Sequence, residues 1–267
     1  MLYRITGKYY WIEQRRMKMG VVLNFQLTAF SNNKIEPNAK NISMLMEKIN
    51  SLNIKEFLPN VTTGQRIDMV KGKMESISNL GFITADQSGQ IMCQDGRIDC
   101  FFNFTPDTQG DFEQNIKNIK LIFKQLLKEN QVIANRLAFN VNLLSDSYVG
   151  DLRNKGFGYN MESTLDFYKG KELKEWSSRE NVRHKIQISN MDEILNVITE
   201  LSMVTSNPGE EKRLFCHMDI NTIYENVKYR FGYESIDEFV DETKKIIVNI
   251  KNNFEELAKS VARDVEG

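Results

Sequence analysis

Three short apolar runs follow one another over residues 74–105, and tight-turn sequences separate them. The turn at residues 86–89 lies between the first two runs, and Asp95-Gly96, a strong hairpin signal, lies between the second and the third. Strands joined by such short loops pair antiparallel, because a parallel crossover needs a much longer connection. Residues 74–105 therefore predict a β-meander, and this prediction limits the possible folds more than any other feature of the chain.

A second set of strand-like runs follows in the C-terminal part of the chain, at residues 182–189, 195–203 and 213–220. Each set is followed by apolar residues at helical spacing, over residues 111–130 after the first set and over 235–260 after the second. Asp111 is the expected N-cap of the first of these helices. The other expected elements are a strand over residues 20–30, a helix over 38–52 and a strand over 132–144.

Because strands and helices are segregated along the chain, we expect an α+β fold. Its expected architecture is two antiparallel β-meander halves, each followed by a long amphipathic helix. The expected organisation is a basic-aromatic N-terminal arm (residues 1–19), an N-terminal α+β half (20–145), a connection (146–180) and a C-terminal α+β half (181–267).

The composition argues against a membrane-bound or secreted protein. The chain has 267 residues and a formal net charge of -1, which gives no overall attraction to nucleic acid or to an anionic membrane. Its three cysteines are too few, and odd in number, for a disulfide framework. No apolar run approaches the roughly 18–20 residues of a membrane-spanning helix. We therefore expect a cytoplasmic protein that does not bind a membrane.

Motifs for phosphate or metal binding are absent from the sequence. Neither G-x-x-x-x-G-K-[S/T] nor G-x-G-x-x-G occurs. Cys93 and Cys100 fall on adjacent expected strands, whereas Cys216 and His217 are neighbours in one strand and so point to opposite faces. His217 shares a strand face with Asp219, a spacing that suits either a hydrogen bond or a metal pair. We expect no metal and no cofactor.

The most enzyme-like spacing in the chain is that of Asp166, Glu172 and Lys174. In many metal-dependent nucleases two carboxylates hold a divalent cation and a lysine polarises the attacking water. The segment around Glu172 is polar and favours a helix, whereas such nucleases place these residues on a strand. A metal-dependent nuclease is therefore an alternative hypothesis for the function.

The N-terminal arm is net basic and rich in aromatic residues. Arg15, Arg16 and Lys18 could contact phosphates, and Trp11 could stack on a base. A non-catalytic nucleic-acid-binding protein that uses these four residues is a second alternative. The same residues could grip a protein partner.

Two segments resemble a known family. The run ANRLAFNVNLL, at residues 134–144, follows an expected amphipathic helix, and RLFCHMDINT, at residues 213–222, precedes a long helix that contains Phe239 and Phe254. This arrangement, over most of residues 20–260, is similar to a sporadically distributed family of uncharacterised prokaryotic proteins of about this length.

Arg136 and Asp219 match characteristic polar positions of that family, to which no role is attached. A sporadic distribution is typical of genes in defence loci or on mobile elements. The resemblance therefore implies an accessory component of a prokaryotic defence or toxin–antitoxin system.

These observations favour a non-enzymatic protein-interaction module over an enzyme. No set of residues passes a geometric test for catalysis, and antiparallel sheets offer broad faces for binding. The expected partner is another protein, encoded nearby, with nucleic acid as the alternative through the N-terminal arm.

Overall fold

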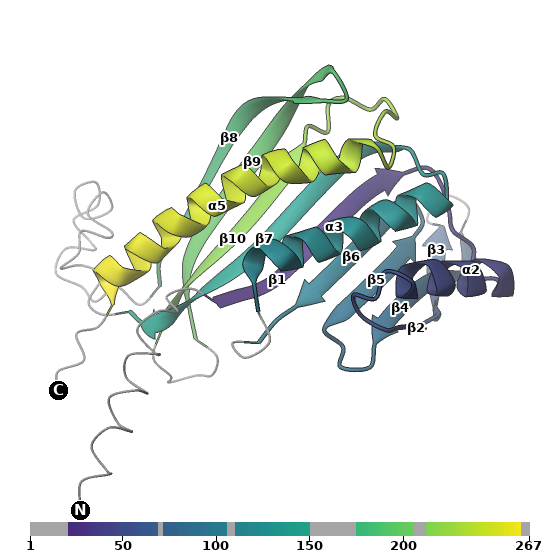
Figure 1. The fold of residues 1–267 in the computed structure, drawn as a ribbon, viewed down its shortest axis with the longest axis horizontal. Helices are drawn as coiled ribbons and strands as arrows, with labels where there is room; N and C mark the ends of the chain where they lie inside the picture. The colour runs from purple at the N-terminus through teal and green to yellow at the C-terminus, as the bar shows by residue number, and fades with distance from the viewer. Residues whose placement is uncertain (1–20, 69–71, 106–109, 150–174, 206–211, 263–267) are drawn as a thin grey trace, which may run out of the picture.

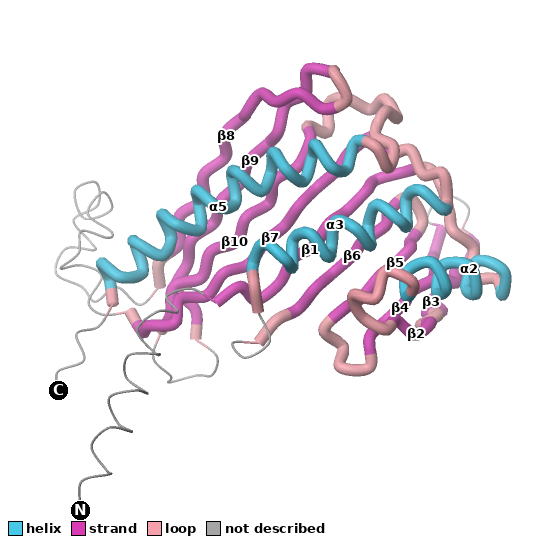
Figure 2. Tube along the Cα trace, in the orientation of Figure 1, coloured by secondary structure: helices cyan, strands magenta, loops and turns pink. Residues whose placement is uncertain are grey.

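The computed structural model describes residues 21–68, 72–105, 110–149, 175–205 and 212–262. Ten described strands form one sheet, and three described helices pack on it (Figures 1 and 2). The strands are β1 (Val21–Ser31), β2 (Phe57–Pro59), β3 (Thr62–Asp68), β4 (Lys73–Thr84), β5 (Gly89–Gln94), β6 (Arg97–Asn103), β7 (Ala134–Tyr148), β8 (Ser177–Ile188), β9 (Met191–Val204) and β10 (Arg213–Thr222). The helices are α2 (Ala39–Asn50), α3 (Phe112–Glu129) and α5 (Ser235–Val261).

The sheet has the strand order β2-β4-β5-β6-β1-β7-β10-β9-β8, and β3 also pairs with β4. All neighbouring strands are antiparallel. The predicted meander at residues 74–105 corresponds to β4, β5 and β6, which pair in sequence order. In the same way β8, β9 and β10 pair in sequence order in the C-terminal part.

The predicted architecture of two meander halves, each followed by its own long helix, was wrong. β1 and β7 pair along their lengths, from Val21 opposite Leu144 to Ser31 opposite Ala134, and β7 also pairs with β10. This contact joins the N-terminal and C-terminal strands into a single ten-stranded sheet. Pairing between strands more than 100 residues apart leaves no local signal in the sequence, because each strand shows only which of its faces is apolar.

The three helices lie side by side on one face of the sheet (Figure 1). α3 contacts β1 and β6, whereas α5 contacts β7, β8 and β10. Phe25 of β1 is at the centre of this interface, because its ring meets Phe104, Phe112 and Phe139 edge-on at 5.4, 5.3 and 5.9 Å between centroids. The central strands are therefore anchored to the helix layer by large buried side chains.

Local signals account well for the helix starts and the tight turns. Asp111 caps α3 as expected, since its carboxylate accepts a hydrogen bond from the Gln114 backbone N–H at 2.7 Å. Ser189 and Asn190 connect β8 to β9 with positive φ angles of 51° and 61°. Two successive left-handed residues form the hairpin turn whose twist matches that of the flanking strands.

Gly81 of β4 lies beside Asn60, in the connection from β2 to β3, and a larger residue cannot fit at position 81. A Cβ atom at this position would be 2.8 Å from the Asn60 carbonyl oxygen and 3.0 Å from that of Ile91. We expect Gly81→Ala to lower the free energy of unfolding by about 1–3 kcal/mol, measured by urea denaturation, because backbone atoms must move. Gly64→Ala is the control, since no atom lies within 4 Å of its added Cβ. If the two variants were equally stable, the close approach of the two carbonyls to position 81 would not limit the residue there.

Candidate binding face of the sheet

The sheet face opposite the helices is lined by polar side chains, and we call it the open face. Successive residues of a strand point to opposite sides. Phe25 and Leu27 of β1 are fully buried under the helices, so Asn24, Gln26 and Thr28 lie on the open face. The same alternation in β7 places Asn140 and Asn142 there.

A row of polar residues crosses six strands of the open face in register. Its members, one each from β6, β1, β7, β10, β9 and β8, are Asn103, Asn24, Asn142, His217, Glu200 and Arg179. We call this set the polar row. Its central residues are half-buried, whereas Asn103 and Arg179 at its ends are exposed.

Hydrogen bonds fix the orientation of the central side chains of the polar row. The Asn142 amide donates through Nδ2 to Asn24 Oδ1 at 3.1 Å. Its Oδ1 atom therefore faces His217, whose Nδ1 lies 2.7 Å away and donates to it. The proton of a neutral His217 is thus on Nδ1, and Nε2 is left as a hydrogen-bond acceptor. An amide rather than a carboxylate orients this histidine, as in a Cys-His-Asn site, but the described thiols are buried in the core and none lies beside it.

A buried carboxylate anchors a second cluster on the open face. Asp99 of β6 is 1% exposed and accepts hydrogen bonds from Thr28 Oγ1 at 2.6 Å and from Gln26 Nε2 at 2.9 Å. Arg97 Nε pairs with its other oxygen at 2.7 Å. Gln26 in turn accepts from Asn140 Nδ2 at 3.5 Å, which links β6, β1 and β7.

Two buried polar atoms of the open face have no hydrogen-bond partner among the described residues: Asn140 Oδ1 and Arg136 Nε. The Arg136 guanidinium stacks over the Phe30 ring at 4.3 Å. Asn140 lies in register with Asp219, whose Oδ1 accepts from Asn221 Nδ2 at 3.0 Å. An unpaired buried polar atom costs free energy unless a water molecule or a partner satisfies it. The two positions singled out by the family resemblance, Arg136 and Asp219, are thus both on the open face.

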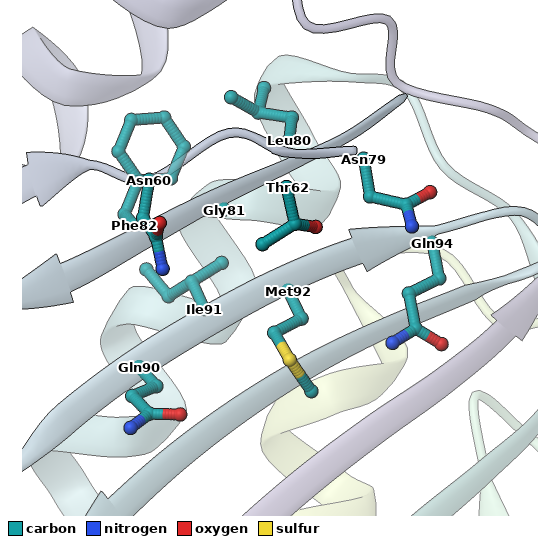
Figure 3. Close-up of a pocket in the computed structure, with 10 residues that line it drawn as sticks. All are labelled: Asn60, Thr62, Asn79, Leu80, Gly81, Phe82, Gln90, Ile91, Met92 and Gln94. Carbon is teal, nitrogen blue, oxygen red and sulfur yellow. The ribbon is translucent and has the colours of Figure 1, made fainter. Parts of the chain in front are cut away.

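A small pocket lies at the β4 end of the open face and is lined by residues of β4 and β5 (Figure 3). Amides of Asn79, Gln90 and Gln94 surround it, together with Met92. Its volume of about 50 Å³ can hold a few water molecules but no substrate of ordinary size. The pocket adds further amide side chains to the open face, and it is too small to enclose a substrate.

The residues predicted for the two alternative functions lie outside the described part of the chain. They are Asp166, Glu172 and Lys174 for the nuclease, and Trp11, Arg15, Arg16 and Lys18 for the N-terminal arm. Most of the predicted connection at 146–180 is outside it as well. Within the described ranges, no group of three or more His, Cys, Asp or Glu residues could hold a metal ion. No described helix has both the length and the apolar character needed to cross a bilayer.

The three thiols belong to the core. Cys93, Cys100 and Cys216 are buried on the helix-facing side, and Cys216 points away from His217 as the sequence predicts. Burial raises the pKa of Cys93 and of Cys216 to about 12, and it raises that of Cys100 as well, with Asp99 adding a smaller effect. None of the three is suited to act as a nucleophile at neutral pH.

These thiols should not react with a thiol reagent in the native protein. At pH 8 we expect no reaction with a thiol reagent before denaturation and three reacting groups after it. A cysteine in the unfolded chain ionises near the ordinary value of 9.0, whereas the folded thiols stay protonated to higher pH. Stability should therefore be unaffected by these groups below pH 9 and should fall as the pH rises from there toward 12. Rapid labelling of any thiol in the native state would contradict this assignment.

Sequence reasoning did not find the polar row as a whole. It placed His217 and Asp219 on one strand face, but Asn24 and Asn142 were not recognised. The sequence signal that could have found these two residues is the alternation of amide and apolar residues, in NFQL of β1 and FNVNL of β7. That alternation shows a polar strand face, and only the pairing of β1 with β7 brings the two faces together.

Comparisons with known proteins give no further guide to the site. No protein-family model matches the sequence, and no curated protein matches it either.

Proposed function

We propose that the protein is a non-catalytic interaction module that binds a protein partner on the open face of its sheet. The observation that carries the proposal is the polar row, a line of polar side chains across six strands that no described helix covers. Hydrogen bonds join its three central members, Asn24, Asn142 and His217. Amides and an imidazole donate and accept hydrogen bonds, so they suit a partner's backbone and polar side chains. The hydrogen bonds among Asn24, Asn142 and His217 fix the positions of these three side chains before binding, which reduces the entropy lost on association.

Two features favour binding over catalysis. The only described histidine of the open face is held by the Asn142 amide, and the described thiols are buried in the core. No described thiol therefore lies beside this histidine, and no group of three or more described His, Cys, Asp or Glu residues could hold a metal ion.

The open face carries charges of both signs, which suits a protein partner. Glu200 lies opposite Arg179 in register, and Asp219 lies beside Asn140 near the centre. The net charge of -1 adds no overall attraction of the chain to a phosphate backbone. The expectation of a defence or toxin–antitoxin context rests on the family resemblance alone, and it stays a prediction.

The proposal is tested by affinity capture of the tagged chain from its own cells. The wild type should retain a protein in stoichiometric amount, and nuclease treatment should not release it. The double variant Glu200→Ala/His217→Ala, within the polar row, should lose that protein. The control is Glu242→Ala/Lys245→Ala, which removes an ion pair of 2.5 Å on the outer side of α5. A chain recovered alone, release by nuclease or equal loss with the control variant would refute the proposal.

A further inference from the structure

The strand β8 forms one edge of the sheet and is exposed along most of its length. Among the described residues it pairs with β9 alone, in an unbroken register from Ser177 opposite Ser202 to Ile188 opposite Met191. Its side chains at 179–185 are exposed on both faces. An edge strand offers a row of backbone N–H and C=O groups to a further strand.

The opposite edge of the sheet is different. β2 has only three residues and ends at Pro59, which has no backbone N–H to donate. The chain then breaks its pairing with β4 before β3 begins at Thr62. A short strand that ends in proline discourages strand addition, whereas β8 contains neither a proline nor a bulge.

Positive side chains of β8 share the open-face side of the strand. Arg179, Arg183 and Lys185 lie at alternate positions on this side, in register with open-face residues of β9. A second copy of the chain is a poor occupant for this edge. Antiparallel pairing of two β8 strands about Asn181 would place Arg179 opposite Arg183, and like charges directly opposite are destabilising. A strand with acidic side chains on the matching face would instead neutralise them.

An aromatic loop adjoins this edge. The segment between β10 and α5 is tied to β8 by an ion pair between Arg183 and Glu225. It exposes Tyr224, Val227 and Tyr229, whose exposed fractions are 72%, 70% and 48%. The guanidinium of Arg230 holds the loop in place through the backbone oxygens of 226 and 228. Tyrosines on a rigid loop give contact area at a low entropic cost, and tyrosine is enriched at binding hot spots.

We propose that the edge of β8, together with the loop at 223–229, binds an extended segment of a partner protein by strand addition. The segment carries acidic side chains at alternate positions, which pair with Arg179 and Lys185 and add to the ion pair of Arg183 with Glu225, and it packs apolar side chains against Tyr224. This surface shares only Arg179, the last residue of the polar row, with the proposed function. The variant that tests the proposed function, Glu200→Ala/His217→Ala, leaves β8 unchanged, so either proposal can fail without the other.

The test uses the full chain and a defined probe, a labelled and capped ten-residue peptide in which Glu alternates with Val. Fluorescence anisotropy measures binding, and hydrogen exchange reports on the amides of residues 177–185. Two control peptides have Lys in place of Glu, or the same Glu and Val residues in two blocks. We expect saturable binding of the alternating Glu peptide, slower exchange at 177–185, and binding at least about tenfold weaker for both control peptides.

Substitutions in the chain test whether the peptide binds at β8. Arg179→Glu/Arg183→Glu/Lys185→Glu should weaken binding at least about tenfold, and Tyr224→Ala about threefold. The matched control is Lys40→Glu/Lys245→Glu/Lys259→Glu, which makes the same change of charge at exposed positions of α2 and α5. It should change binding by less than about twofold, the effect of distant charges screened by salt. Absent binding, equal binding of a control peptide, equal weakening by the control variant or unchanged exchange at 177–185 would each overturn the proposal.

Discussion

Replacing Arg230 by methionine is expected to lower the free energy of unfolding by about 3–5 kcal/mol. Arg230 is 9% exposed and forms a bidentate ion pair with Glu193 of β9, which is 4% exposed. The Nη2–Oε2 distance of this pair is 2.9 Å. Arg230 Nη1 also donates to the Asn135 carbonyl of β7 at 2.6 Å. Removal of the guanidinium leaves a buried carboxylate without its partner and frees the loop before α5 from two strands.

Urea denaturation of a double-mutant cycle distinguishes an ion pair from general packing. Glu193→Met should also destabilise, because it leaves Arg230 buried without a counter-charge. The double variant Arg230→Met/Glu193→Met should be more stable than either single variant, since two apolar side chains of similar length leave no unpaired charge. Strictly additive losses, or a loss below about 1 kcal/mol for Arg230→Met, would contradict the assigned role.

Replacing Asp99 by alanine is expected to cost about 2–4 kcal/mol. Its carboxylate is buried on the open face and accepts from Thr28 and Gln26 as well as from Arg97. The variant leaves the Thr28 hydroxyl, itself 1% exposed, without its acceptor. The same change should loosen the contact between β6 and β1, the pair that carries Asn103 and Asn24 of the polar row.

Thr28→Val is the matched control for Asp99, because it removes one hydrogen bond of the same cluster and keeps the volume of the side chain. It should cost about 1 kcal/mol. Both values are measurable by chemical denaturation of the full chain. If the two variants lost the same amount of stability, Asp99 would be an ordinary hydrogen-bond acceptor and not the anchor of the cluster.

The parts of the fold that were predictable from the sequence are those encoded over short distances. The turn at Asp95-Gly96 fixes the hairpin of β5 and β6, and Asp111 fixes the start of α3. Apolar residues at helical spacing gave α5, which covers Ser235–Val261. In each case the sequence signal lies in the same segment of the chain as the turn or helix that it determines.

The single sheet and its open face depend on contacts between distant segments. Asn24 and Asn142 are 118 residues apart, and the hydrogen bond that joins them exists only because β1 pairs with β7. Glu193 and Arg230 form a buried ion pair across 37 residues, yet each reads as an ordinary surface charge in its own segment. Alternation along a strand shows which side is apolar, but it does not identify the neighbouring strand.

The central claim is that the open face binds a protein partner, and site-specific photo-crosslinking in the cells that make this protein tests it most directly. A benzoylphenylalanine in place of Phe101 lies on β6 of the open face, in register with Gln26. The same group in place of Lys245 lies on the exposed side of α5. Illumination should give a nuclease-resistant adduct of defined mass from position 101 and none from position 245. Equal adducts from both positions, no adduct from position 101, or an adduct that nuclease removes would contradict the claim.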